Sequence, residues 1–315
     1  TYTIGPTMIN ELRLGFNRRV YTSVPETYGQ DWARQLGIPN ASPLTFPDLL
    51  TAGGARFYGL GPGGSSREVA EDFTFQENFT KVYNRHTFKF GYELIRTRYN
   101  ALAEAYPSGR YRMGGTDFPF RPNTGNDFAA FLLGSVIRSD FTFNAATWLP
   151  RWWHHALYAQ DSWRPTRNLT LEFGVRWSYE SPFSTKYGQQ SQFDPTVTDP
   201  LTGRMGAIVH GKQALAKRDL NNFAPRLGAA WTFHPRAVFR ASYGITHVDL
   251  MTNGTNQNFE EYLATAVVQP PPGDPRVAFY LSQGPPAINL TLAPDGSVPF
   301  PGTNYAGRPA SWFDP

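Results

Sequence analysis

Short runs along the chain alternate apolar and polar residues, and a glycine repeatedly takes a place on the polar side. In the run 11–17, Leu12, Leu14 and Phe16 are spaced two apart and would share one face of a strand, while Gly15 and its charged neighbours share the other. The same arrangement recurs around Gly91, Gly174, Gly228 and Gly244. The pattern predicts antiparallel strands with one apolar face and one polar, glycine-bearing face.

Alternation alone fits both a soluble sandwich, whose apolar face is buried, and a membrane barrel, whose apolar face meets lipid. Strand length separates the two, because most of the predicted runs have about 12 residues, whereas strands of soluble proteins have about 5 or 6. Length therefore favours the membrane barrel. The predicted strands cover residues 10–20, 71–83, 87–99, 152–163, 169–180, 222–233 and 237–249.

The connections between these strands alternate between tight turns and segments of about 40 residues or more, rich in Gly, Pro, Asn and Ser. Short periplasmic turns and long extracellular loops are the plan of an outer-membrane barrel. The long loops are expected over residues 22–70, 100–151, 181–221 and 250–315, without regular structure except helical turns within 31–36 and 126–136. The predicted fold class is an all-β, antiparallel transmembrane β-barrel segment, part of a larger barrel.

Aromatic residues gather near both ends of the predicted strands, where a barrel meets the two water interfaces. The candidates for interface positions are Tyr83, Phe88, Trp153, Trp163, Tyr179 and Trp231. A general preference of aromatic residues for strands gives some of this pattern without a membrane. The lipid face of 152–163 stays open, because His154 and Gln160 lie on one side of that run and His155 and Asp161 on the other.

Composition further narrows the classes of protein to which the chain can belong. The 315 residues carry a formal charge of +4 with scattered basic residues, which argues against a nucleic-acid partner. There is no cysteine, and no apolar run approaches the roughly 18 residues of a membrane helix. The chain begins at Thr1 without a signal-peptide pattern, so we expect an internal piece of a longer barrel with further strands.

Several runs together resemble the barrel of TonB-dependent outer-membrane receptors, and most of all their Oar-like branch, over about residues 8 to 248. These runs are Asn10–Arg18, His86–Glu93, Phe128–Gly134, the hairpin from Tyr158-Ala-Gln-Asp-Ser-Trp163 to Leu169-Thr-Leu-Glu-Phe-Gly-Val-Arg176, and Asn221-Asn-Phe-Ala-Pro-Arg-Leu-Gly228. The resemblance implies a 22-stranded barrel with an internal plug, energised uptake through TonB, and a carboxypeptidase-regulatory-like domain. The sequence has no recognisable plug, TonB-contacting segment or final aromatic-ended strand, so we expect the middle part of such a barrel.

No enzyme is predicted, because the sequence has neither a nucleophile motif nor a phosphate-binding glycine loop, and no cofactor or metal is expected. Adjacent His154 and His155 would face opposite sides of a strand and could not share one ion. Two other sets are candidate functional residues. Lumen-facing candidates are Glu93, Glu172, Arg176, Arg226 and Arg240, and loop residues for substrate contact are Arg110, Tyr111, Arg112 and Trp148.

The leading hypothesis is a TonB-dependent transport or receptor barrel in the cell outer membrane, surrounded by lipid. Its long loops would capture an extracellular substrate, and its partners would include a plug domain and TonB. Two alternatives remain open: a secreted soluble β-protein that binds or hydrolyses carbohydrate, and a structural or adhesive surface barrel without transport.

Overall fold

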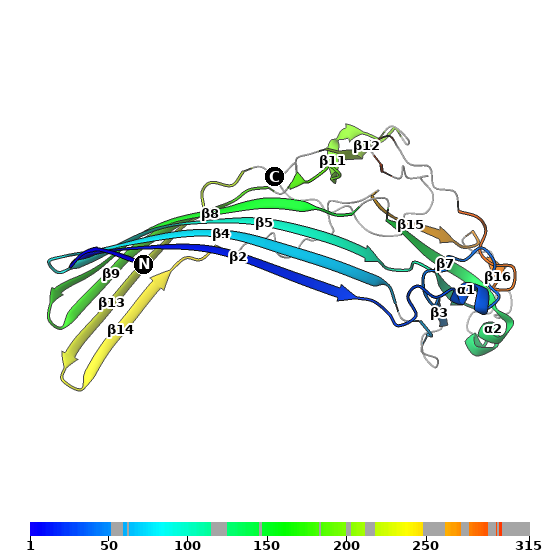
Figure 1. Ribbon diagram of the computed structural model, residues 1–315, viewed down its shortest axis with the longest axis horizontal. Coiled ribbons are helices and arrows are strands. Elements are labelled where there is room, and N and C mark those ends of the chain that lie inside the picture. The colour runs from blue at the N-terminus through cyan, green and yellow to red at the C-terminus, as the bar shows by residue number, and fades with distance from the viewer. Residues whose placement is uncertain are drawn as a thin grey trace.

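One large antiparallel sheet dominates the computed structural model (Figure 1). Its strands follow the order β1-β2-β4-β5-β8-β9-β13-β14, with β10 attached to β8. The structure describes residues 1–51, 59–61, 63–114, 125–144, 147–182, 184–199, 203–211, 218–247, 262–271, 277–288, 294 and 296–297. The strands of this sheet are β1 (Tyr2–Gly5), β2 (Met8–Ser23), β4 (Ser65–Tyr83), β5 (His86–Glu104), β8 (Pro150–Thr166), β9 (Leu169–Glu180), β10 (Ser184–Thr185), β13 (Phe223–His234) and β14 (Ala237–Gly244).

All seven strands predicted from the alternation are present, so the antiparallel all-β architecture is confirmed. The bounds of β9 agree with the prediction, whereas β4 and β5 reach 19 residues each and extend well beyond it at their loop ends. β14 ends at Gly244, and residues 248–249 of its predicted range lie outside the described residues. The short strand β1 was not predicted.

Tight turns join β4 to β5, β8 to β9 and β13 to β14, and all three lie at the same end of the sheet (Figure 1). In the first of them Asn84 has a φ of 52°, a left-handed conformation that asparagine tolerates better than most residues. The longer connections gather at the opposite end, as expected from their alternation along the chain.

Strand register divides the sheet into two faces. The row of neighbouring residues Arg13, Gln76, Glu93 and Ala156 lies on the polar face, and the next row, Leu14, Phe75, Leu94 and His155, lies on the apolar face. Since side chains alternate along each strand, the register also settles the orientation of β8. His155 and Asp161 lie on the apolar face, and His154 and Gln160 lie on the polar face.

The apolar face is largely uncovered. Leu14 is 75% exposed, and large apolar side chains of every long strand in the sheet are also exposed on this face. Polar side chains interrupt it in places: the Asn10 side-chain amide donates to Glu77 at 2.9 Å, and His86 lies 2.7 Å from Asp161. An exposed apolar surface of this extent is unusual for a soluble monomer.

The prediction that the long loops lack regular strands is wrong for the described residues. A second sheet, in the order β15-β7-β6-β3 with β16 beside β7, forms at the loop end, and β11 pairs with β12 separately. These strands are β3 (Asp48–Thr51), β6 (Arg110–Met113), β7 (Ser135–Asn144), β11 (Ser191–Thr198), β12 (Met205–His210), β15 (Leu263–Val268) and β16 (Phe279–Tyr280). We call the second sheet and α2 (Asp127–Leu133) the outer layer.

The outer layer has a hydrophobic core of its own, because segments far apart in the chain bring alternating apolar residues together. Tyr111 and Met113 of β6 are fully buried there against Val136 and Phe141 of β7. β3 joins β6 in parallel, and β15 pairs with β7 from more than a hundred residues away. Such non-local contacts produce a folded layer where the sequence indicated only loops.

Both predicted helical turns are present. In α2 the Asn126 side chain accepts hydrogen bonds from the backbone N–H groups of Phe128 and Ala129, and Gly134 ends the helix in the left-handed conformation. α1 (Trp32–Gln35) begins after Asp31, whose carboxylate accepts from the N–H of Arg34. Within the described residues, neither helix is long and apolar enough to cross a membrane.

Candidate functional site

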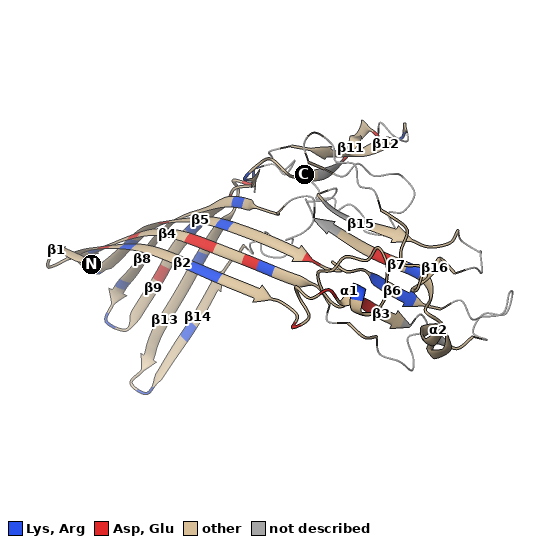
Figure 2. Ribbon diagram, turned by 45° about the vertical axis from the view of Figure 1, so that its right-hand side comes forward, with Lys and Arg blue, Asp and Glu red and all other residues tan. Residues whose placement is uncertain are grey.

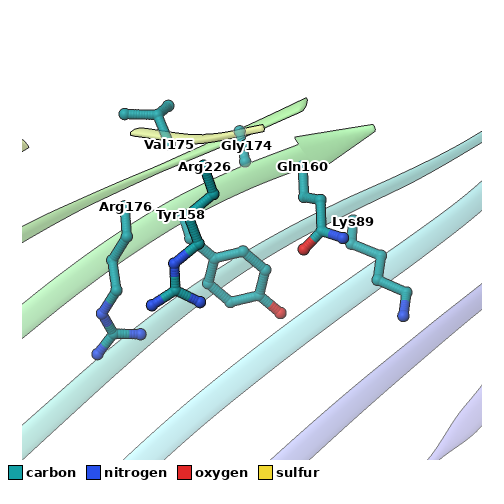
Figure 3. A pocket seen from close by; sticks show the side chains of 8 residues that line it. Lys89, Tyr158, Gln160, Gly174, Val175, Arg176 and Arg226 are labelled. Atoms are coloured by element: carbon teal, nitrogen blue, oxygen red, sulfur yellow. The ribbon is translucent and has the colours of Figure 1, made fainter. Parts of the chain in front are cut away.

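A hollow of about 360 Å³ lies on the polar face of the large sheet. Four strands, β5, β8, β9 and β13, contribute to it, and the side chains of Lys89, Tyr158, Gln160, Arg176 and Arg226 extend to this side of the sheet (Figure 3). Its full lining is Lys89, Tyr158, Ala159, Gln160, Gly174, Val175, Arg176 and Arg226. The candidate site is therefore a concave patch of long polar side chains in the sheet itself.

Gly174 creates the space. Register places it between Gln160 of β8 and Arg226 of β13, in a row that also contains Lys89 of β5. Because Gly174 has no side chain, the long side chains on either side of it border a gap. A Cβ added at this position would lie 3.5 Å or more from its nearest neighbour, which is ordinary contact, so the glycine leaves real room.

Gly91 has a different role beside the hollow. The Tyr158 ring lies across Gly91, so that a Cβ at position 91 would come within 2.2 Å of the ring. The Tyr158 hydroxyl donates to the Asn78 side-chain oxygen at 2.7 Å, which holds the ring flat against the sheet. The glycines of the polar face thus make room for side chains of neighbouring strands.

The hollow is basic. Lys89, Arg176 and Arg226 line it, and its lining has no carboxylate. Arg176 donates to Glu93 at 2.8 Å, whereas neither Lys89 nor Arg226 has a carboxylate within ion-pair distance among the described residues. Two uncompensated cations around a concave space favour an anionic partner.

Glu93 is the centre of a polar cluster next to the hollow. It accepts hydrogen bonds from Gln76 and Arg176, and its Oε1 lies 3.6 Å from Nε2 of His154. His155 lies on the other face, where Nδ1 is 2.9 Å from the Tyr92 hydroxyl, so the prediction that the two histidines point to opposite sides is confirmed. No group of three or more acidic or histidine side chains in the described part of the chain is arranged to hold a metal ion.

Register places all five lumen-facing candidates on the polar face, but they do not form one site. Arg176 and Arg226 line the hollow, and Glu93 contacts Arg176. Glu172 lies two residues along β9 from Gly174, beside Gly228 of β13. Arg240 of β14 lies opposite Ala230 of β13, outside the hollow. Lys89, Tyr158 and Gln160 were not among the candidates. The spacing from Glu93 puts Lys89 on the polar face, whereas Tyr158 and Gln160 are placed there only by the pairing of β8 with β5.

The four loop candidates for substrate contact have different surroundings. Arg110 and Arg112 lie in β6, with Arg110 Nε 3.5 Å from Asp48 and Arg112 Nε 3.6 Å from Asp140. The Tyr111 side chain is fully buried, and Trp148 is 6% exposed. The expectation of direct surface contact is therefore corrected for these two aromatics. Alternation in β6 turns Tyr111 into the core while the flanking arginines point outward, and Trp148 is buried in a separate cluster with Tyr262 and Tyr99.

All six candidates for interface aromatics lie on the apolar face and separate into two groups. Tyr83, Phe88, Trp163 and Trp231 lie at the short-turn end, and Trp153 and Tyr179 lie toward the loop end. His86 stacks between Phe88 and Trp163, with ring centroids 5.4 Å and 5.6 Å apart, and its Nδ1 lies 2.7 Å from Asp161. Two aromatic belts separated by an apolar surface are typical of a strand layer that crosses a bilayer.

Comparison with known proteins agrees with this geometry. A family model described as an outer membrane beta barrel domain matches residues 1–313. No curated protein and no solved structure matches the chain. The match favours a membrane barrel over the secreted soluble protein, and it explains the uncovered apolar face as a surface for lipid. The chain belongs to the outer-membrane β-barrel domain family and is located in the outer membrane.

Proposed function

We propose that this chain forms the wall of a TonB-dependent transport receptor of the Oar-like type. In this proposal the outer layer captures an extracellular substrate, the polar face lines the lumen, and a plug gates passage in response to TonB. The protein performs transport without catalysis. The sequence resemblance over about residues 8 to 248 supports the assignment to this branch.

The basic hollow is the observation that carries the proposal. The interior of outer-membrane barrels is polar, and cations there that lack carboxylate partners favour an anionic ligand. Lys89 and Arg226 have no such partner among the described residues, although Glu172 lies opposite Gly228, two residues along β13 from Arg226. A lumen that meets an acidic plug surface or an anionic solute accounts for this arrangement.

The outer layer supports substrate capture because it is folded rather than loose. Asp140 is buried and holds Arg138 at 2.7 Å, so the side chains around it keep fixed positions. Arg112 is partly exposed beside the same carboxylate. A preorganised surface binds a ligand at a lower entropic cost than a disordered loop.

The test compares solute uptake in cells of the native host that carry the intact gene with cells that lack it. Depletion of solutes from the medium is measured by mass spectrometry, with TonB present or deleted and with the proton gradient intact or collapsed. We expect at least one solute whose depletion requires the gene, TonB and the gradient. Depletion that needs the gene alone would indicate a passive pore, and no gene-dependent depletion would favour the structural or adhesive barrel.

A double variant and a control variant test whether transport depends on the hollow. Lys89→Gln combined with Arg226→Gln removes both unpartnered cations, and Arg240→Gln removes a cation from the same face outside the hollow. We expect uptake to fall at least tenfold in the double variant and to stay within twofold in the control. Equal uptake in all three proteins would contradict a role of the hollow in transport.

A further inference from the structure

A second group of arginines lies on the apolar face, at the loop end of the large sheet. Arg96 and Arg98 are two residues apart on β5 and therefore point to the same side. Register pairs Arg96 with Phe73 of β4 and Trp153 of β8. Arg98 pairs with Glu71 of β4, whose neighbour on β2 is Arg18. Figure 2 shows the charged segments of β2, β4 and β5 side by side in this region.

Their depth along the strand matches a water interface of the membrane. Phe88 marks the aromatic belt at the short-turn end, and Arg98 lies ten residues further along β5. At about 3.3 Å per residue and a tilt of about 40°, this separation spans roughly 25 Å, which is the height of the apolar band of a barrel. Arg98 therefore lies at the far edge of the band, where the head groups of the outer leaflet begin.

Aromatic rings hold both guanidinium groups in place. Arg96 lies over the Trp153 ring at 4.5 Å from its centroid, and Arg98 lies over the Phe73 ring at 4.9 Å. A guanidinium that rests on a ring keeps its N–H edges free and loses less conformational freedom when it binds an oxyanion. The two stacked arginines are thus preorganised donors that face the lipid side.

The carboxylates nearby do not neutralise this group. Glu71 forms an ion pair with Arg18 at 3.4 Å, and Arg151 donates to the carbonyl oxygens of Tyr99 and Pro150. Neither Arg96 nor Arg98 has a carboxylate within ion-pair distance in the described part of the chain. Glu71 lies opposite Arg98 and is shared with Arg18, so this group of arginines keeps an excess of positive charge.

We propose that Arg96 and Arg98, on their Trp153 and Phe73 rings, bind the phosphate groups of a phosphorylated lipid in the outer leaflet. The acyl chains would lie along the apolar face below, over Leu14, Phe75 and Leu94. Guanidinium forks bind phosphate oxygens in pairs, and a basic cluster at the head-group level selects anionic lipids. This site is independent of the proposed transport, because it lies on the opposite face of the sheet from the hollow.

The test measures lipid binding to the intact detergent-purified protein by native mass spectrometry. The probes are a bis-phosphorylated, acylated glucosamine disaccharide, the same lipid after enzymatic dephosphorylation, and inorganic phosphate as a competitor. We expect the phosphorylated lipid to bind at least tenfold more tightly than the dephosphorylated one. Arg96→Gln combined with Arg98→Gln should abolish this preference, while Arg19→Gln, next to Arg18 but on the polar face, should leave it within twofold.

Folding of each variant is checked by its heat-dependent migration in gel electrophoresis, and Arg98→Gln alone replaces the double variant if that one does not fold. The single variant should lose at least threefold in affinity for the phosphorylated lipid. Unchanged affinity in the folded variant, or equal binding of both lipids, would overturn the proposal. Displacement of the lipid by inorganic phosphate at a similar concentration would also overturn it, because it would identify a site for free phosphate.

Discussion

Gly91 and Tyr158 are neighbours across the β5–β8 pair, and the tyrosine ring occupies the space that a side chain at position 91 would need. Gly91→Ala would push the ring away and break its hydrogen bond to Asn78. We expect a loss of about 1–3 kcal/mol in the free energy of unfolding, measured by denaturant titration in lipid vesicles.

Gly174→Ala is the matched control for this substitution, because its added methyl would make only ordinary contacts at 3.5 Å or more. It should change the free energy of unfolding by less than about 0.5 kcal/mol. If both alanine variants lost the same stability, steric exclusion by the Tyr158 ring would not be the cause.

Glu93 and Arg176 should stabilise the barrel as a coupled pair. A double-mutant cycle with Glu93→Gln and Arg176→Gln is expected to give a coupling energy of about 0.5–2 kcal/mol, since the pair is only partly exposed. The same cycle with Glu93→Gln and Arg226→Gln should be additive within about 0.5 kcal/mol, because these two side chains form no ion pair. Equal coupling in both cycles would point to a general charge effect of the lumen.

Asp48 should make the outer layer sensitive to pH. Burial raises the pKa of its carboxyl above the ordinary value, although the N–H of Gly63 and the Arg110 guanidinium lower it in part. The uncharged form is therefore favoured in the folded state, and its stabilising effect is present below about pH 4 and is lost as pH rises through the folded-state pKa. Relative to the wild type, Asp48→Asn should protect β3 amides from hydrogen exchange more at pH 7 than at pH 4.

Asp194 should show the opposite pH dependence in the same hydrogen-exchange measurement. Hydrogen bonds from the hydroxyl and N–H of Thr196 lower the pKa of its carboxyl, so its contribution is present above the unfolded-state pKa and is lost as pH falls. Asp194→Asn should therefore reduce protection near β11 more at pH 7 than at pH 4. The same pH trend in both variants would contradict the assigned burial effect at Asp48.

The cap of α2 should be a local determinant of stability in the outer layer. Asn126→Ala removes the acceptor for two backbone N–H groups and is expected to destabilise the helix by about 1 kcal/mol. Hydrogen exchange at residues 128–131 measures the change, and Asn126→Ser should preserve most of the protection. Equal exchange in the alanine and serine variants would show that the side-chain cap is not required.

The long strands were predictable because each carries its own alternation, which depends only on neighbouring residues. Contacts between side chains of different strands could not be predicted in this way. Glu93 and Arg176 come from β5 and β9, and only the register of β8 between them brings their side chains together. For β8 itself, both faces contain a histidine, and the partner strands decide which one meets lipid.

The outer layer was missed because its strands are short and their partners are distant. β6 has four residues, and β15 pairs with β7, which lies more than a hundred residues earlier in the chain. A local signal was nevertheless present, since Arg110, Tyr111, Arg112 and Met113 alternate polar and apolar residues over the whole of β6. That alternation would have placed Tyr111 in a core rather than on a surface.

The unequal lengths of the strands have a consequence for access from outside the cell. β5 continues for six residues beyond Arg98, and β4 accompanies it to Ser65. At about 3.3 Å per residue and a tilt of about 40°, this extension raises the outer layer by roughly 15 Å above the head groups. With Arg98 at the head-group level, the paired ends of β4 and β5 would hold the outer layer clear of the bilayer surface, where its exposed side can be reached from the surrounding water.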